Sequence, residues 1–202
     1  MSLIRPMFFF FSLLFYIAAS AQTLQDIPDT PFTQKDTAYW VYNFRQFRDA
    51  VYQNNKEKAR AFVDLPIAVG NNHIWGLAYG LNSPAFENMG GKAKPFTEAD
   101  FNKYFNKIFG KEFINCILKI KTEELYKTGE YATITFEDSL ASKSYGMIAT
   151  WHRPDNTLML NILSRTVYEE DGNDAVGEFA IIYIFEVTKR GHIKLKSVAL
   201  AG

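Results

Sequence analysis

Three polar side chains in the C-terminal third of the chain have the setting that a ligand site needs. Alternate residues of the segment 157–167 form a row in which Asn161 and Arg165 interrupt apolar positions, and a similar row in 178–188 contains Tyr183. A few polar groups on an apolar face give a pocket its specific contacts. Asn161, Arg165 and Tyr183 are therefore candidate ligand-binding residues, unless these strands simply alternate between core and solvent.

A second candidate site lies in the segment 70–95, which is rich in Gly and Asn and shows no clear period. It carries three aromatic residues that regular helix or strand packing does not obviously explain, namely Trp75, Tyr79 and Phe86. Long loops without structure of their own are uncommon unless they are functional. We expect 70–95 to be either a lid over a pocket or a surface loop anchored by these aromatic residues.

Other kinds of site lack the spacing that their chemistry requires. His73, His152 and His192 have no second His or Cys at metal-ligand spacing. The four carboxylates of 169–174 do not fit a helix-loop-helix calcium site, so we interpret 169–177 as a solvated acidic loop. Neither a Gly-rich phosphate loop nor a Gly-x-Ser-x-Gly elbow occurs. We therefore predict no metal, no cofactor and no nameable catalytic residue.

Cys116 is the single cysteine of the chain, so it cannot form an internal disulfide. It belongs to an apolar stripe at helical spacing with Phe113, Ile117 and Ile120. No neighbouring base is present in the local sequence to activate the thiol. We expect Cys116 to be buried and unreactive.

The composition excludes several classes of protein. The chain has 202 residues, 22 basic and 22 acidic side chains, 48% hydrophobic residues and 18 Phe. A disordered chain would be less hydrophobic, and a disulfide scaffold would need more cysteine. The formal net charge of zero argues against binding to nucleic acid through bulk electrostatics.

The first 21 residues have the form of a secretory signal peptide. Arg5 precedes an uncharged run of about 11 residues from Met7 to Ile17, and Ala19-Ser20-Ala21 supplies the small residues that a signal peptidase reads. The run is shorter than the roughly 20 residues that span a bilayer, although an uncleaved anchor is the alternative. We predict cleavage before Gln22 and an exported product, periplasmic or secreted, without a lipid anchor or a membrane span.

The remaining chain places helices before strands. Residues 22–37 contain two prolines and are expected to form an extended lead-in. Hydrophobic spacing predicts helices over 38–53, 56–63, 97–109, 111–120 and 122–126, and a short strand over 65–69. Alternation then predicts strands over 131–136, 144–153, 157–168, 178–188 and 192–200. This order predicts an α+β domain over 38–202, with N-terminal helices packed on a curved antiparallel sheet of about five to six strands.

The helical segments and the first strand start also carry a family resemblance. The opening is Phe44-x-x-Phe47-Arg48-Asp49-Ala50-Val51 followed by Leu65-Pro66-Ile67, and a later helix has Asp100, Phe101, Tyr104, Ile108 and Phe109. These segments resemble cystatin-like domains of the nuclear-transport-factor-2-like superfamily in exported bacterial proteins, although Leu65 stands where Phe is usual. The resemblance implies a curved sheet wrapped around helices as a cone, which in different members supports isomerases or dehydratases, small-ligand binding or protein contacts.

Three functions follow as hypotheses. The first is a non-catalytic exported binding module for a small apolar ligand, a glycan or a partner protein. The alternative is a small acid-base isomerase or lyase of the ketosteroid-isomerase-like kind, in which Tyr183, Arg165 and Asn161 converge with a carboxylate such as Glu186 or Asp100. An inhibitor or adaptor that uses an exposed apolar patch is a third reading. A homodimer is compatible with the sequence.

Overall fold

The computed structural model of the chain describes residues 40–70, 73–80, 83–89, 93–171 and 173–202. The predicted signal peptide 1–21 and lead-in 22–37 lie outside these ranges. Within them, no helix combines the length and the hydropathy required to cross a bilayer.

The first two helices form where the hydrophobic spacing predicts them. Helix α1 (Trp40–Tyr52) buries its apolar stripe, including Phe44 and Phe47. Asn54 then takes a left-handed conformation with a φ of 53°, which ends the helix. Helix α2 (Lys56–Arg60) is shorter than the predicted 56–63 and is capped by Asn55, whose side chain accepts a hydrogen bond from the Lys58 amide.

Two predictions for the segment 65–95 are wrong. The expected strand 65–69 is reduced to one isolated antiparallel bridge between Ile67 and Phe96. The expected loop 70–95 contains helix α3 (Ile74–Tyr79) and helix α4 (Pro84–Met89). Both helices are about a turn and a half long, and a hydrophobic period cannot be recognised over so few residues.

The next three helices follow the sequence closely. Helix α5 (Glu98–Ile108) starts with the predicted capping box, in which Thr97 and Asp100 hydrogen-bond reciprocally through side chain and backbone. Partial burial of Asp100 acts to raise its pKa, but the hydrogen bonds from Thr97 and the nearby charges of Lys94 and Lys103 together outweigh burial, so the pKa lies below its ordinary value. Helix α6 (Lys111–Ile117) and helix α7 (Thr122–Thr128) complete the helical part.

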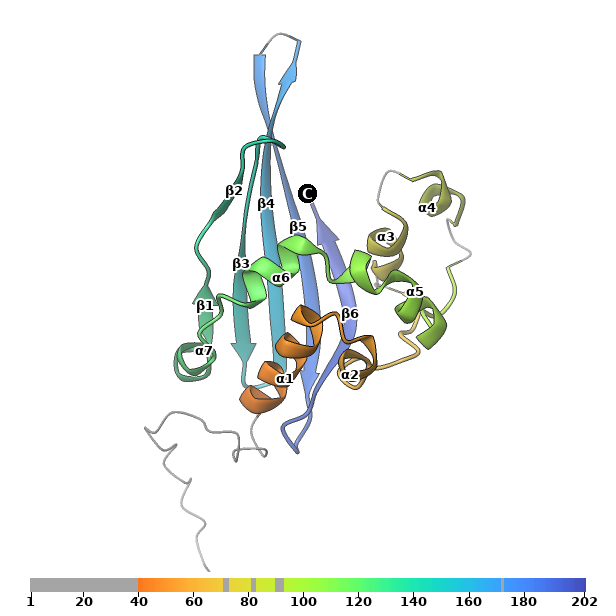
Figure 1. The fold of residues 1–202 in the computed structure, drawn as a ribbon, viewed down its shortest axis with the longest axis vertical. Coiled ribbons are helices and arrows are strands. Elements are labelled where there is room, and N and C mark those ends of the chain that lie inside the picture. The colour runs from red at the N-terminus through yellow and green to blue at the C-terminus, as the bar shows by residue number, and fades with distance from the viewer. Residues whose placement is uncertain (1–39, 71–72, 81–82, 90–92, 172) are drawn as a thin grey trace, which may run out of the picture. The chain divides into compact units, whose positions relative to one another are not determined.

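The rest of the described chain forms one antiparallel sheet, which confirms the predicted α+β fold. The strands are β1 (Glu130–Ala132), β2 (Phe136–Asp138), β3 (Lys143–His152), β4 (Thr157–Glu170), β5 (Asn173–Val187) and β6 (Ile193–Ala201). They are ordered β1-β3-β4-β5-β6, and β2 pairs with β3 beyond β1. The sheet is curved and does not close into a barrel (Figure 1).

Helices α1 and α6 cross one face of this sheet, and α3, α4 and α5 lie beyond its β6 edge (Figure 1). Helices α6 and α7 contact β3, and helices α1 and α3 contact β6. We call the covered side the helix face; its residues are buried and include Met147, Leu160, Tyr183 and Leu195. The interior between helices and sheet is packed with phenylalanine: Phe44, Phe47, Phe96, Phe101, Phe105, Phe109, Phe113 and Phe185 are each at most 1% exposed.

Strands β4 and β5 are longer than predicted and project beyond their neighbours as a two-stranded arm, light blue in Figure 1. Pairing with β3 stops at Thr166, but β4 and β5 stay paired as far as Glu170 and Asn173. The predicted acidic loop 169–177 is therefore wrong, because most of it is strand. Its residues are largely exposed on both faces, so the strand alternation that signals β-structure is absent there.

The outer edge of β6 is closed by residues from the helical part. The Leu195 amide donates to Phe62 O and its carbonyl accepts from the Asp64 amide. Further along, the His73 amide donates to Val198 O, and the Leu200 amide donates to His73 Nδ1 at 3.0 Å. Backbone groups along most of this sheet edge thus have hydrogen-bond partners within the chain. The edge is therefore not a site for uncontrolled strand pairing.

Candidate functional site

The side of the sheet opposite the helices, which we call the open face, carries the candidate site. Strand register arranges its side chains in rows that run across the sheet. One row is polar, with Ser144, Arg165 and Glu178 as direct cross-strand neighbours. The row beside it consists of Gly146, Leu163, Ala180 and Ala201. The row after that contains Ile148, Asn161, Ile182 and Ala199.

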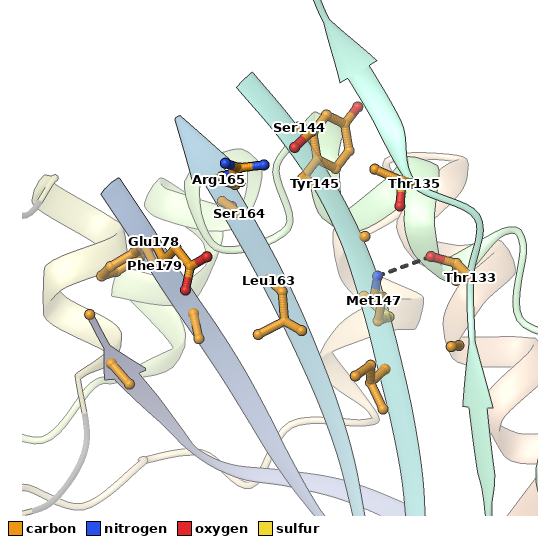
Figure 2. Close-up of a pocket in the computed structure, with 16 residues that line it drawn as sticks. Thr133, Thr135, Ser144, Tyr145, Met147, Leu163, Ser164, Arg165, Glu178 and Phe179 are labelled. Carbon is orange, nitrogen blue, oxygen red and sulfur yellow. Dashed lines mark hydrogen bonds between the residues drawn. The ribbon is translucent and has the colours of Figure 1, made fainter. Parts of the chain in front are cut away.

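The row of small residues hollows the open face. Three of its four members have either no side chain or only a methyl group, whereas both flanking rows carry longer side chains. The result is an open trough with a volume of about 560 Å³. Leu163 is its one large floor residue and is 43% exposed (Figure 2).

The connection between β1 and β2 forms one wall of this trough (Figure 2). Thr133 is fixed to β3 by two hydrogen bonds: its amide donates to Met147 O at 2.9 Å, and its hydroxyl accepts from the Met147 amide at 2.9 Å. Thr135 also lines the trough. A wall held by these two hydrogen bonds keeps its shape without a ligand, as preformed sites do.

Two opposite charges stand at the rim. Arg165 and Glu178 are exposed and lie directly across from each other on β4 and β5 (Figure 2). No ion pair involves either side chain in the part of the chain that the structure describes. Both charges are therefore available to a bound molecule, beside an aliphatic floor.

The structure separates two of the sequence-predicted residues from the third. Asn161 and Arg165 lie on the open face, but Tyr183 lies on the helix face. Its hydroxyl donates to Ile108 O at 2.6 Å, and burial raises its pKa far above the ordinary value. Asn161 lies one row beyond the trough floor, and its Oδ1 has no hydrogen-bond partner in the described structure. Of the three, Arg165 alone lines the trough.

Two of the aromatic candidates of 70–95, Trp75 and Tyr79, form a packed cluster, and none of the three candidates lines the trough. Trp75 is 4% exposed, stacks on Tyr79 with ring centroids 5.3 Å apart, and donates from Nε1 to Lys94 O at 2.8 Å. Tyr104 of α5 meets both rings edge-on. Phe86 is half-buried against the core. These contacts explain the aromatic residues as anchors for α3 and α4, while a ligand role for them stays a prediction.

The residues of the acid-base alternative do not converge. Asp100 is engaged in the capping box of α5, and Glu186 lies in a different row from Arg165 and forms an ion pair with Lys196 at 3.3 Å. Tyr183 faces the opposite side of the sheet from both Arg165 and Glu186. The described residues contain no group of three or more His, Cys, Asp or Glu placed to hold an ion.

Cys116 is buried as predicted. From its environment we predict that the thiol reacts slowly. Burial raises the pKa of the thiol from 9.0 to about 11, the Glu112 carboxylate acts in the same direction, and a hydrogen bond with Thr133 opposes both. The thiolate is the reacting species, so ionisation alone should slow alkylation by iodoacetamide about 100-fold at pH 8.

The measurement is the alkylation rate of the folded protein against that of the same protein in denaturant. We expect slow labelling of the folded chain and rapid labelling after unfolding. Equal rates in both states would contradict a buried, protonated thiol.

Comparison with known proteins did not identify a family for this chain. A scan against protein-family models found no match, and a search of curated proteins found none either.

Sequence reasoning missed most of the trough. The floor combines three small residues with one leucine, all on separate strands that only strand register aligns: Gly146, Leu163, Ala180 and Ala201. The sequence signal that does exist is the presence of Gly and Ala at outward positions of otherwise bulky strands. Without the register, such positions cannot be assigned to a common row.

Proposed function

We propose that the chain is an exported, non-catalytic binding module of the cystatin-like kind, and that it holds a small apolar ligand in the open-face trough. The observation that carries this proposal is the trough itself, a preformed hollow with an aliphatic floor beside two unpaired rim charges. The helical order and the residues that resemble cystatin-like domains support the family. The form of residues 1–21 supports export.

The space between helices and sheet is less suited to a ligand. Phe47 contacts the rings of Phe62, Phe109, Phe113 and Phe185 with centroid separations between 5.3 and 6.2 Å. Aromatic rings at these distances fill the interior that a cone would otherwise offer. A small ligand therefore finds its space on the open face.

The trough also favours one type of ligand. Its aliphatic floor suits a flat apolar body, and the Arg165 guanidinium can pair with an anionic group at one end. The Ser144 hydroxyl, beside Arg165 in the same row, can donate to that group as well. Glu178 occupies the other end of this row, so the anionic end should lie toward Ser144.

The anionic fluorophore 1-anilinonaphthalene-8-sulfonate combines an apolar body with one sulfonate and serves as the test probe. We expect saturable binding at one site on the folded protein. Ala180→Leu should weaken it at least about tenfold, because the new side chain occupies the trough. Arg165→Gln should weaken it about threefold, the size of an exposed charge interaction.

Ala199→Leu is the matched control, since it adds the same side chain to the open face one row away from the trough floor. It should leave the affinity within about twofold. Near-UV circular dichroism establishes that each variant is folded, because this probe also binds loosened cores. Equal loss in both Leu variants, or unsaturable binding, would refute the trough as the site.

A further inference from the structure

Helices α1 and α7 border a second hollow, which is open to solvent. Its volume is about 610 Å³, and it is lined by Arg45 and Arg48 of α1 and by residues 120–124. None of these residues lines the open-face trough. Of the described residues that line the second hollow, Ile120 alone is apolar. A lining of this kind suits a polar molecule, in contrast to the aliphatic floor of the trough.

Arg45 is engaged by neighbouring side chains of this hollow. Its Nε donates to Thr122 Oγ1 at 3.1 Å, and its guanidinium pairs with the Glu123 carboxylate. The Thr122 hydroxyl in turn donates to Glu123 Oε2 at 3.1 Å. Thr122 is only 2% exposed. These contacts hold one wall of the hollow in place, so a ligand would not have to order it.

Arg48 is the side chain of the hollow whose hydrogen bonding is incomplete. It lies three residues beyond Arg45 and therefore on the same face of α1. Its Nε is buried but has no hydrogen-bond partner among the described residues. The Asp49 carboxylate is 51% exposed, and its Oδ1 lies 3.6 Å from this Nε, which is too far for a hydrogen bond. A buried donor without a partner is rare and points to a bound molecule or ion.

We propose that Arg48 binds the carboxylate of a small, polar, singly charged acid in this hollow. The guanidinium fork matches the two oxygens of a carboxylate. The lining carries three cations and two carboxylates, which leaves one positive charge in excess. Glu123 already pairs with Arg45. Glu124 pairs with Lys121 at 3.7 Å, so the cation in excess is Arg48.

Charge favours a monoanion over a doubly charged phosphate group. A dianion would exceed the single positive charge in excess, and Glu123 and Glu124 would repel it. The same two carboxylates retain lone pairs that can accept hydrogen bonds from hydroxyl groups. The Lys121 ammonium can donate to hydroxyl oxygens, since this side chain is 71% exposed. A hydroxylated acid, such as a sugar acid, therefore fits this hollow better than an apolar acid.

The test uses D-glucuronate, a hydroxylated monocarboxylate, at neutral pH. D-glucose and D-glucose 6-phosphate share its sugar ring and provide the neutral and the doubly charged comparison. We expect glucuronate to shift the NMR signals of the Arg48 Nε–H and of the backbone amides of 120–124 in a saturable manner. Glucose and glucose 6-phosphate should each bind at least about tenfold more weakly, because neither offers Arg48 a singly charged carboxylate.

Three variants separate the guanidinium fork from its charge. Arg48→Gln removes both and should weaken glucuronate binding at least about tenfold. Arg48→Lys keeps the charge but not the fork and should weaken binding about threefold. Arg190→Gln is the matched control, because it removes an equal charge from the exposed turn between β5 and β6 and should bind within about twofold. Near-UV circular dichroism establishes that each variant is folded.

Several results would overturn the proposal. The absence of a saturable shift with glucuronate would show that water alone satisfies Arg48. Equal affinity for glucose, tighter binding of glucose 6-phosphate, or an Arg48→Gln variant that binds like the natural chain would each contradict the carboxylate site. The proposal does not depend on the trough: Ala180→Leu should leave glucuronate binding intact, and Arg48→Gln should leave the binding of 1-anilinonaphthalene-8-sulfonate intact.

Discussion

Phe47→Ala should lower the free energy of unfolding by about 3–5 kcal/mol, among the largest effects of a single core substitution. Phe47 is fully buried and its ring contacts the rings of Phe62, Phe109, Phe113 and Phe185, which come from three other parts of the chain. Removing it leaves a cavity at the point where helices and sheet meet. Urea unfolding followed by circular dichroism measures the change.

Tyr52→Ala is the matched control on the same helix. Tyr52 is 61% exposed at the end of α1, so its truncation should change the unfolding free energy by no more than about 0.5 kcal/mol. A Phe47→Ala variant as stable as this control would mean that the interior is loosely packed. In that case the space between helices and sheet would again be open to a ligand.

Tyr183→Phe should lower the unfolding free energy by about 1–3 kcal/mol at neutral pH, because the Ile108 carbonyl loses its donor inside the core. The variant should also change the pH dependence. Burial raises the pKa of Tyr183 well above 10.0, so the unfolded state releases this proton first as the pH rises. The folded protein should therefore lose about 1.4 kcal/mol per pH unit above pH 10 through this group, and the variant should lack that component.

The measurement is the urea-unfolding free energy at several pH values between neutrality and pH 11. Tyr168→Phe is the control, because Tyr168 is 46% exposed on the arm and should leave the pH profile unchanged. A Tyr183→Phe variant with the natural profile above pH 10 would show that the hydroxyl is not held protonated by the core.

Local signals in the sequence predicted those parts of the fold that local interactions determine. Thr97 and Asp100 specify the start of α5 through a hydrogen-bonded pair three residues apart, and Phe96 and Phe101 flank it. The apolar stripe of α1 likewise lies within one helix. Such features need no knowledge of the rest of the chain.

The prediction errors arose in segments where side-chain exposure does not indicate the secondary structure. The residues 169–177 carry several carboxylates, and charge indicates contact with solvent rather than a particular backbone conformation. An arm with solvent on both faces shows no alternation, so it resembled a loop. Trp75 and Tyr79 seemed unexplained because the partner that packs on them, Tyr104, lies on a later helix.

Predicting the site would have required the pairing register of the strands, which depends on residues far apart in the sequence. Arg165 and Tyr183 belong to neighbouring strands, and a shift of one residue in their pairing would place them on the same face. The observed pairing sets Leu160 opposite Tyr183 and Glu178 opposite Arg165, which divides the predicted constellation between two faces. The sequence could indicate the residue types but not this division.

Closure of the β6 edge makes native folding depend on completion of the chain. Lys194 Nζ donates to Ala61 O, Lys196 Nζ to Asp64 Oδ2, and the Leu200 amide to His73 Nδ1, across sequence separations of 133, 132 and 127 residues. Contacts between such distant residues make folding slow. While the chain is synthesised from its N-terminus, α1 and α2 must wait for the last strand. A chain without this strand would leave apolar surface of α1 uncovered, and such surface makes partly folded chains prone to aggregate.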